Sequence, residues 1–358
     1  MNELRLAVAG GRKTQSIVDE CAAADARRRI LVLTYTQVNQ AEVRDRLAAL
    51  GPLSARVDVQ GWFSFLMAHW VRPYLPALYP YRRLRGLNFE GQPHMYATGE
   101  TRFLDTESKA YMRHLACLAT EVCAACDSAV LDRLSRIYDT IYVDEVQDLN
   151  GWDLEILAAL MDSPIKLRLV GDVRQALLLT NPRDQKNKQY KGVAIKTWFA
   201  QHEAAGRLRI THENRTWRSN QLIADFADSI FDATWGFPPT ESQGASTTGH
   251  DGVFAVAAED AVAYWRAFDP LCLRHSAASG KSIALPYMNI GMAKGMDVDR
   301  VLIWPTEGVL KFLSRGSSLA STPCCSLYVA VTRARHSVAF IAEKPERLNL
   351  PVWTPAVR

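Results

Sequence analysis

The chain has 358 residues, of which 48% are hydrophobic and 22% are charged, a composition typical of globular proteins that excludes a disordered or fibrous chain. At roughly 100–200 residues per domain, this length predicts two domains, each large enough to bury its own core. The net charge of +4 permits a nucleic-acid partner without requiring one.

The cysteines and the apolar runs predict the compartment. Seven scattered cysteines are typical of a reducing environment rather than of a disulfide framework. Cys123 and Cys126 form a CxxC pair with no second pair nearby, and we interpret it as structural because zinc needs four ligands. The sequence from Met1 runs straight into a short strand, and no apolar run approaches the ~20 residues of a membrane span. We therefore expect a soluble, cytoplasmic protein with no membrane partner.

Short apolar runs alternate with helical stretches along the whole chain. Several of these runs are continuously apolar, as expected of strands buried on both faces. Alternation of such strands with helices predicts an α/β fold with parallel sheets. The predicted strands are residues 4–9, 30–35, 56–59, 140–143, 167–170, 208–211, 253–256, 301–304 and 338–342.

Composition shifts predict the domain organisation. Residues 72–102 carry Pro, Tyr, Arg and Gly without clear periodicity, and we interpret them as part of a short insertion near 72–130. Residues 181–192 are polar and basic, and form either a surface loop or the approach to a hinge between domains. Residues 238–252 are rich in Pro, Ser, Thr and Gly and predict a flexible loop. We expect a first domain over 1–200 and a second over 201–358.

The first candidate site is a glycine-containing turn after the first strand. It reads Ala7-Val8-Ala9-Gly10-Gly11-Arg12-Lys13-Thr14. This follows the phosphate-loop pattern G-x-x-x-x-G-K-[ST] only in part, because alanine and arginine replace its two glycines. Gly10 and Gly11 can still expose backbone N–H groups, Lys13 can bind β- and γ-phosphates, and the Thr14 hydroxyl can bind Mg²⁺. Arg12 adds charge beside the phosphates but brings a Cβ atom to a position that favours glycine. The pattern therefore leaves two alternatives, a working ATPase and a weak or silent one.

Carboxylates follow two predicted strands farther along the chain. The strand 140–143 ends in Asp144-Glu145, and the strand 167–170 ends in Gly171-Asp172-Val-Arg-Gln175. The carboxyl ends of parallel strands meet at the edge where α/β proteins bind ligands. Beside a nucleotide, Asp144 would hold Mg²⁺ and Glu145 would orient or deprotonate the attacking water. The alternative is an acidic helix N-terminus after a strand.

These two segments resemble motifs II and III of the superfamily-one helicases, specifically the UvrD, Rep and PcrA group. Further segments resemble the remaining motifs of that family, in family order and over nearly the whole chain. They are residues 30–36 with 41–44 (motif Ia), 60–65 (Ib), 214–219 (IV), 291–297 (V) and 327–335 (VI). The resemblance implies two RecA-like P-loop NTPase lobes with parallel sheets, and ATP in the cleft between the lobes.

The resemblance also implies roles for individual residues. Gln175, Arg218 and Arg333 would contact the γ-phosphate, although the two arginines could instead be ordinary surface charge. Trp217 stands where the family has an adenine-stacking Tyr, and Asp297, next to Gly295, stands at the ribose-contacting Glu. The residues implied to contact single-stranded DNA are Thr34, Tyr35, Thr36 and Lys294.

Aromatic and basic side chains supply further candidates for nucleic-acid contact. Trp62 and Phe63 can stack on bases, with core packing as the open alternative. Basic clusters that could either contact phosphates or be solvated loop charges are Arg82, Arg83 and Arg85, and Lys186 with Lys188.

The sequence departs from the family pattern in several places. The upstream Gln motif is missing, the aromatic after motif III is replaced by Ala-Leu-Leu-Leu, and Gly291 stands where a DNA-contacting His is common. Motifs IV and V are only about seventy residues apart, so the 2B insertion is absent or vestigial. The departures predict a compact core with reduced accessory subdomains.

Three hypotheses follow from the resemblance. The leading one is a UvrD-like DNA helicase or translocase that uses ATP and Mg²⁺ to move on single-stranded DNA, 3′ to 5′ by family analogy. The second is a DNA-sensing regulatory ATPase subunit that controls a partner nuclease, since residues 61–66, 72–74 and 294–303 are similar to the GajB subunit of the Gabija antiphage system. The third is an RNA helicase of the same superfamily.

Overall fold

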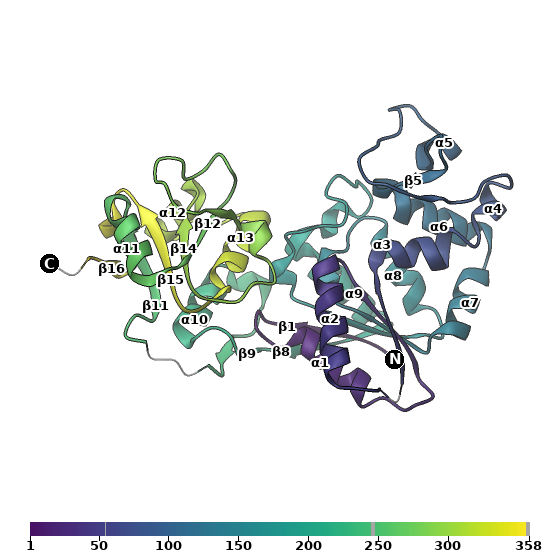
Figure 1. Cartoon of the computed structure of the whole chain (residues 1–358), viewed down its shortest axis with the longest axis horizontal. Coiled ribbons are helices and arrows are strands. Elements are labelled where there is room, and N and C mark those ends of the chain that lie inside the picture. The colour runs from purple at the N-terminus through teal and green to yellow at the C-terminus, as the bar shows by residue number, and fades with distance from the viewer. Residues whose placement is uncertain (54, 245–247, 356–358) are drawn as a thin grey trace. The chain divides into compact units, whose positions relative to one another are not determined.

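The computed structural model describes residues 1–53, 55–244 and 248–355, and the chain forms two compact units (Figure 1). Unit 1 consists of Met1–Leu6, Lys13–Gly171 and Leu179–Thr211. Unit 2 consists of Ala7–Arg12, Asp172–Leu178 and His212–Arg358. The expected division after residue 200 differs from these units in two ways. Unit 1 continues to Thr211, and two short segments, Ala7–Arg12 in the phosphate loop and Asp172–Leu178, belong to unit 2.

Unit 1 is built on a six-stranded sheet with the order β3-β2-β6-β7-β1-β8. The neighbouring strands β3 and β2, β2 and β6, β6 and β7, and β7 and β1 are parallel. The strands are β1 (Asn2–Ala7), β2 (Arg29–Thr34), β3 (Arg56–Gly61), β6 (Thr140–Val143), β7 (Lys166–Gly171) and β8 (Leu208–Glu213). The last five residues of β2 and all of β6 are buried, as continuously apolar strands predict.

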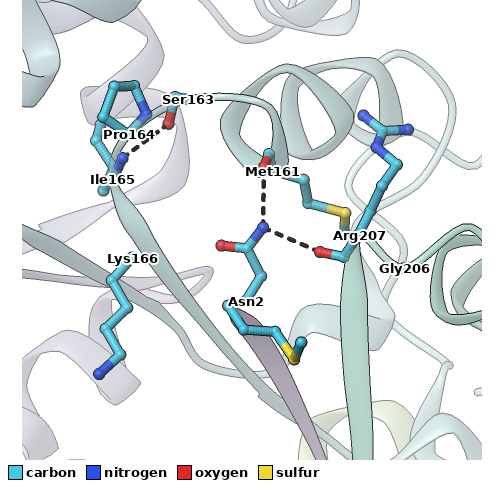
Figure 2. Close-up of a pocket in the computed structure, with 9 residues that line it drawn as sticks. Asn2, Met161, Ser163, Pro164, Ile165, Lys166, Gly206 and Arg207 are labelled. Atoms are coloured by element: carbon cyan, nitrogen blue, oxygen red, sulfur yellow. Dashed lines mark hydrogen bonds between the residues drawn. The ribbon is translucent and has the colours of Figure 1, made fainter.

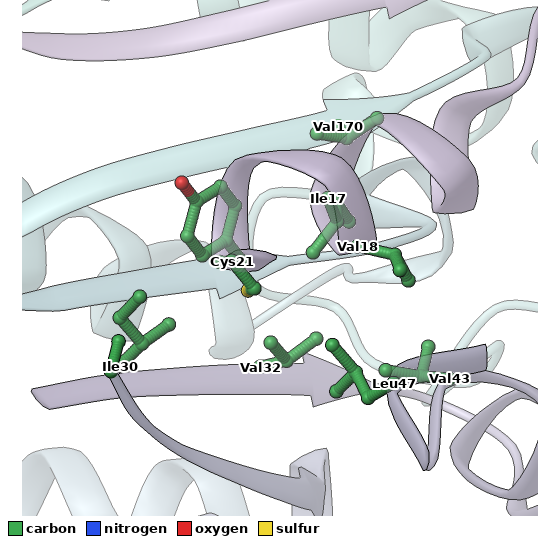
Figure 3. Close-up of a cluster of buried hydrophobic side chains, with 10 residues drawn as sticks. Ile17, Val18, Cys21, Ile30, Val32, Val43, Leu47 and Val170 are labelled. Atoms are coloured by element: carbon green, nitrogen blue, oxygen red, sulfur yellow. The ribbon is translucent and has the colours of Figure 1, made fainter. Parts of the chain in front are cut away.

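Helices and a small sheet complete unit 1. The helices are α1 (Lys13–Ala22), α2 (Gln37–Ala49), α3 (Trp62–Phe65), a π-helical turn (Leu66–Val71), α4 (Leu75–Leu78), α5 (Glu100–Phe103), α6 (Leu115–Ala125), α7 (Ala129–Ile137), α8 (Asp153–Met161) and α9 (Ile195–Ala204). The small sheet pairs β4 (Gly86–Asn88) with β5 (Lys109–Tyr111) inside the segment expected to be an insertion. Figure 3 shows how α1 and α2 pack on the large sheet, with Ile17, Val18 and Cys21 facing Ile30 and Val32 of β2. This packing fixes where α1 begins, and with it the position of Lys13 and Thr14.

Unit 2 contains a second six-stranded sheet, with the order β13-β12-β14-β15-β11-β16 and parallel pairing throughout. Its strands are β11 (Gly252–Ala257), β12 (Leu271–Arg274), β13 (Met288–Asn289), β14 (Val298–Trp304), β15 (Ala334–Ala342) and β16 (Val352–Trp353). A separate short pair joins β9 (Arg215–Thr216) to β10 (Glu241–Ser242). The helices are α10 (Gln221–Ser229), α11 (Ala261–Phe268), α12 (Glu307–Arg315) and α13 (Ser321–Val331).

The predicted α/β fold with parallel sheets is confirmed, and two such sheets are consistent with two RecA-like lobes. Every predicted strand is present, and β6 has the predicted bounds. All seven cysteines lie in the described ranges and are free thiols. Across the described ranges, no single helix is both long and apolar enough to cross a membrane, and only the bent pair Met112–Ala125 and Ala129–Ile137 reaches that length and composition, with a 103° break between its two parts.

Candidate functional site

The carboxylate pair after β6 lies beside the start of α1 in unit 1. Asp144 is buried, with 2% of its surface exposed. The Thr14 hydroxyl donates a hydrogen bond to Oδ2 of Asp144 at 2.9 Å, and the backbone N–H of Glu145 donates to Oδ1 at 2.9 Å. The structure thus brings together the two oxygen donors that the sequence predicts as ligands of Mg²⁺.

The electrostatics of Asp144 favour a cation at this place. Burial and the neighbouring charge of Glu145 raise the pKa of Asp144, while the Thr14 hydrogen bond and the Lys13 charge oppose the rise. Mg²⁺ is commonly held by one or two protein oxygens together with substrate phosphates and waters. Thr14 and Asp144 fit that donor set. Within the described residues no cluster of three or more His, Cys, Asp or Glu side chains is arranged to hold a metal.

Glu145 is held by a residue to which the sequence assigned no role. Its backbone lies in the left-handed region at φ 53°, a strained conformation for a non-glycine residue that is typical of functional sites. The Gln147 side chain is fully buried and donates a hydrogen bond to Oε2 of Glu145. A Cβ atom at Gly171 would collide with Oε1 of Gln147, so a larger residue where β7 ends would displace the Gln147 side chain.

Gly10 and Gly11 of the phosphate loop belong to unit 2 and pack against residues 215–218 of the same unit. A Cβ atom at Gly10, where φ is 73°, would lie 2.6 Å from both Cβ of Arg218 and Oγ1 of Thr216. The Trp217 N–H donates to the Gly10 carbonyl at 3.1 Å, and the Thr216 hydroxyl donates to the Ala9 carbonyl at 2.8 Å. At Gly11 a Cβ atom would lie 2.9 Å from the carbonyl oxygen of Val8. Both glycines are therefore required by close approach of the backbone.

Arg12 adopts the conformation that the phosphate-loop pattern reserves for glycine. Its φ is 54°, in the left-handed region that costs a residue with a Cβ atom free energy. Its guanidinium carbon lies 4.5 Å from the centre of the Trp217 ring, and the Arg215 guanidinium lies 5.5 Å from the same ring. These are cation–π distances, so the ring expected to stack on adenine contacts two cations instead.

The residues expected to contact the γ-phosphate form a hydrogen-bonded group in unit 2. Gln175 donates through Nε2 to Oδ2 of Asp172 at 2.9 Å and accepts from Nη2 of Arg333 at 3.1 Å. Arg218 donates through Nη1 to the Thr332 carbonyl at 3.1 Å. Arg333 is 1% exposed, so its interpretation as ordinary surface charge is wrong. The assignment of these residues to a γ-phosphate stays a prediction.

The motif V residues lie at the start of β14. The Asp297 carboxylate accepts a hydrogen bond from Nε of Arg335 at 3.0 Å and lies 3.6 Å from Nε of Arg218. Gly295 has φ 88°, which suits a glycine, and Lys294 is half-buried. The carboxylate predicted to contact ribose is therefore paired with arginines in this structure.

The predicted DNA-contacting residues divide into half-buried and buried ones. Tyr35 and Phe63 are half-buried and follow β2 and β3, with ring centres 5.9 Å apart in an edge-to-face arrangement. Thr36 caps α2 by accepting the Asn39 N–H at 3.1 Å. Thr34 is 1% exposed, so its side chain does not reach the surface.

Trp62 corrects the expectation of base stacking. It is 1% exposed, and its indole N–H donates to Oδ1 of Asp153 at 2.7 Å. A ring buried at the start of α3 with its polar atom paired is unavailable to a base, so the alternative of core packing applies to Trp62. Thr180 donates to the other oxygen of the same carboxylate.

The buried Asp153 makes stability depend on pH. Burial raises the pKa of Asp153 to about 6, against the hydrogen bonds from Thr180 and Trp62. A carboxyl whose pKa is higher in the folded state stabilises that state at low pH, and the contribution is lost as pH rises through the folded pKa. Asparagine at position 153 cannot ionise. We therefore expect the free energy of unfolding of Asp153→Asn, relative to that of the wild type, to increase between pH 4 and pH 7 by up to about 3 kcal/mol. Urea unfolding at each pH measures this difference, and Asp45→Asn, at an exposed position, is the control that should show none.

A hollow of about 680 Å³ lies at the amino end of β1 and β7 in unit 1 (Figure 2). The Asn2 side chain donates to the carbonyls of Met161 at 2.9 Å and Arg207 at 3.1 Å, and accepts the Leu167 N–H at 3.1 Å. The carboxylates of the candidate site follow the carboxyl ends of the strands, at the opposite edge of the sheet. This hollow therefore contains none of the predicted site residues. Its polar groups join β1 to its neighbours.

One comparison with known protein families matches a helicase domain. Residues 100–178 match the model of the UvrD/REP helicase N-terminal domain, a segment that includes Asp144, Glu145 and Gln175. A comparison with curated proteins returned no match. Residues 100–178 are therefore similar to a helicase domain, which agrees with the expected resemblance over that segment.

Three solved helicase structures are similar to this chain at low identity. The structure of PRRSV helicase is 14% identical, with a TM-score of 0.46 and coverage of 99% of this chain and 56% of that chain. Arterivirus nonstructural protein 10 (helicase) is 13% identical, with a TM-score of 0.49 and coverage of 98% and 62%. The same arterivirus protein in a complex with DNA is 14% identical, with a TM-score of 0.48 and coverage of 97% and 62%. The chain thus spans 56–62% of the length of these chains, and at these scores the similarity carries no argument about function.

Proposed function

We propose that the chain is an ATP-dependent DNA helicase or translocase of the UvrD type. The observation that carries this proposal is the 2.9 Å hydrogen bond between Thr14 and Asp144. It joins the end of the phosphate loop to the carboxylate after β6, directly beside Glu145. The helicase-like match over residues 100–178 supports the same assignment.

The proposed chemistry assigns one task to each polar group. Thr14 and Asp144 would hold Mg²⁺, which when bound neutralises phosphate charge and orients the nucleotide. Lys13 would balance the charge of the β- and γ-phosphates. Glu145, positioned by Gln147, would accept a proton from the attacking water.

The proposal also assigns roles to three residues of unit 2, which are two arginines and Gln175. Arg218 and Arg333 would stabilise negative charge on the transferring phosphoryl group, and Gln175 would respond to its presence. Tyr35 and Phe63 would stack on bases of single-stranded DNA, a contact that tolerates any sequence and suits a translocating protein. Movement from 3′ to 5′ is part of the proposal by family analogy alone.

The test compares DNA-stimulated ATP hydrolysis by the wild type, Lys13→Ala and the control Lys281→Ala, whose side chain is exposed. We expect Lys13→Ala to lower kcat/KM at least about 100-fold, because it removes charge stabilisation at the phosphates, and Lys281→Ala to match the wild type. Equal background rates for the wild type and Lys13→Ala contradict the proposal. RNA that stimulates hydrolysis better than DNA favours the RNA helicase.

A regulatory ATPase that controls a partner nuclease in antiphage defence is the second candidate. The observation that favours it is Arg12, which occupies a left-handed position and covers Trp217. Unwinding of a fluorescent duplex, with and without a co-purifying nuclease, separates the two candidates. Hydrolysis without unwinding, together with ATP-dependent control of the nuclease, supports the regulatory subunit.

The stack between Arg12 and Trp217 predicts competition with adenine. If adenine stacks on Trp217, Arg12 has to leave at least one face of the ring. We expect Arg12→Ala to bind adenosine about threefold more tightly than the wild type, since an exposed cation–π contact contributes roughly 0.5–1 kcal/mol. Adenosine carries no phosphate, so the lost charge does not affect this comparison. Calorimetric titration measures the affinity, Arg28→Ala is the exposed control, and weaker binding by Arg12→Ala contradicts the prediction.

A further inference from the structure

A buried hydroxyl of unit 2 contacts the phosphate loop. Tyr328 lies on α13 and is 2% exposed. Its hydroxyl accepts a hydrogen bond from the Ala9 N–H at 3.2 Å and donates one to Oδ2 of Asp172 at 3.1 Å. The roles proposed above do not include this residue.

The hydrogen bonds continue from Asp172 to the arginine of motif VI. The same Oδ2 atom of Asp172 accepts from Nε2 of Gln175 at 2.9 Å, and Oε1 of Gln175 accepts from Nη2 of Arg333 at 3.1 Å. Donor and acceptor directions are consistent at every step, because the amide of Gln175 can satisfy both partners in one orientation only. The result is a continuous chain of hydrogen bonds from the backbone at Ala9 to the guanidinium of Arg333.

Arg174 contacts two members of this series of hydrogen bonds, Asp172 and Tyr328. Its Nη1 donates to Oδ1 of Asp228 at 2.7 Å, its Nε lies 3.4 Å from Oδ1 of Asp172, and its guanidinium lies 4.6 Å from the centre of the Tyr328 ring. The second oxygen of Asp172 is therefore engaged as well, and the tyrosine ring is fixed from one face. Burial raises the pKa of Tyr328, so the hydroxyl keeps its proton and remains a donor at neutral pH.

We propose that the Tyr328 hydroxyl is a positioning group that makes the orientation of Gln175 and Arg333 depend on the conformation of the phosphate loop at Ala9. Backbone N–H groups of a phosphate loop bind phosphate. When a triphosphate changes the position of the Ala9 N–H, Tyr328 loses or gains its donor, and the Asp172–Gln175–Arg333 chain adjusts in turn. This inference rests on the proposed ATPase function and deepens it, since it names how nucleotide occupancy reaches the γ-phosphate residues.

The test is Tyr328→Phe, which removes only the hydroxyl. We expect kcat for DNA-stimulated ATP hydrolysis to fall about tenfold, the effect of one lost hydrogen bond, while KM for ATP changes less than twofold. On a Gln175→Ala background the same substitution should have no further effect, because the chain is already interrupted. The control is Tyr264→Phe, which removes another buried hydroxyl of unit 2, bonded to Nε2 of His250 at 2.9 Å; we expect it to leave kcat unchanged.

A second measurement does not require hydrolysis. Hydrogen–deuterium exchange of residues 172–178, with and without a non-hydrolysable ATP analogue, should change in the wild type and stay constant in Tyr328→Phe. An unchanged kcat in Tyr328→Phe, effects that add to those of Gln175→Ala, or an equal exchange response in both proteins overturns the inference. A wild type that binds the analogue without hydrolysing ATP contradicts the proposed function alone, and the exchange response then decides the role of Tyr328.

Discussion

Glu145→Gln is expected to lower kcat for ATP hydrolysis by about 10²–10⁴-fold, the range for loss of a general base. Gln147 donates to the Glu145 side chain, and glutamine at 145 can still accept that bond through its amide oxygen. The substitution therefore removes the basic oxygen while the left-handed turn at 145 and the neighbouring Thr14–Asp144 contact remain. Affinity for an ATP analogue should change less than threefold, because the phosphates are held by other groups.

Steady-state hydrolysis and equilibrium binding measure the two quantities separately. Glu259→Gln, at an exposed position in unit 2, is the matched control and should behave as the wild type. A Glu145→Gln protein with more than a tenth of the wild-type kcat would show that another group accepts the proton. A parallel loss of nucleotide affinity would instead indicate a disturbed site.

Arg174→Ala is expected to reduce the free energy of unfolding by about 3–5 kcal/mol, as breaking a buried ion pair does when one partner is left behind. Arg174 is 3% exposed and lies between Asp172 and Asp228. Its guanidinium also lies 5.3 Å from the centre of the Phe237 ring. Without it, two carboxylates of unit 2 lose their buried cation.

Urea unfolding followed by circular dichroism measures this loss. Arg266→Ala, at an exposed position on α11 of the same unit, should lower stability by less than about 0.5 kcal/mol, as surface substitutions usually do. Arg174→Lys keeps the charge and should recover part of the loss. A loss below about 1 kcal/mol in Arg174→Ala would mean that water replaces the guanidinium and that the ion pair contributes little.

The sheets were predictable because their strands are long and apolar enough to be recognised locally. β6 is buried at all four residues and has the bounds that the sequence predicts. Within the two six-stranded sheets, the sequence did not predict β13 and β16, which have two residues each, or β12, whose four residues follow a proline. Such strands exist because a neighbouring strand is already in place, and this information is not local.

The candidate site was predictable where it depends on strand ends. Thr14 and Asp144 each follow a recognisable strand, so their contact follows from the order of a parallel sheet. The burial of Trp62 and the bonds of Tyr328 were not predictable in this way. Tyr328 meets partners 156 and 319 residues away in sequence, and no local pattern encodes such pairings.

The path of the backbone between the two units has a mechanical consequence. The chain passes from one unit to the other after Leu6, Arg12, Gly171, Leu178 and Thr211. The two short excursions that result carry the glycines of the phosphate loop and Gln175. Any rotation of one unit must therefore be absorbed by backbone torsions at the five crossings, four of which flank these two excursions. Under the proposed function, stiffening either excursion would therefore slow ATP hydrolysis and movement on DNA together.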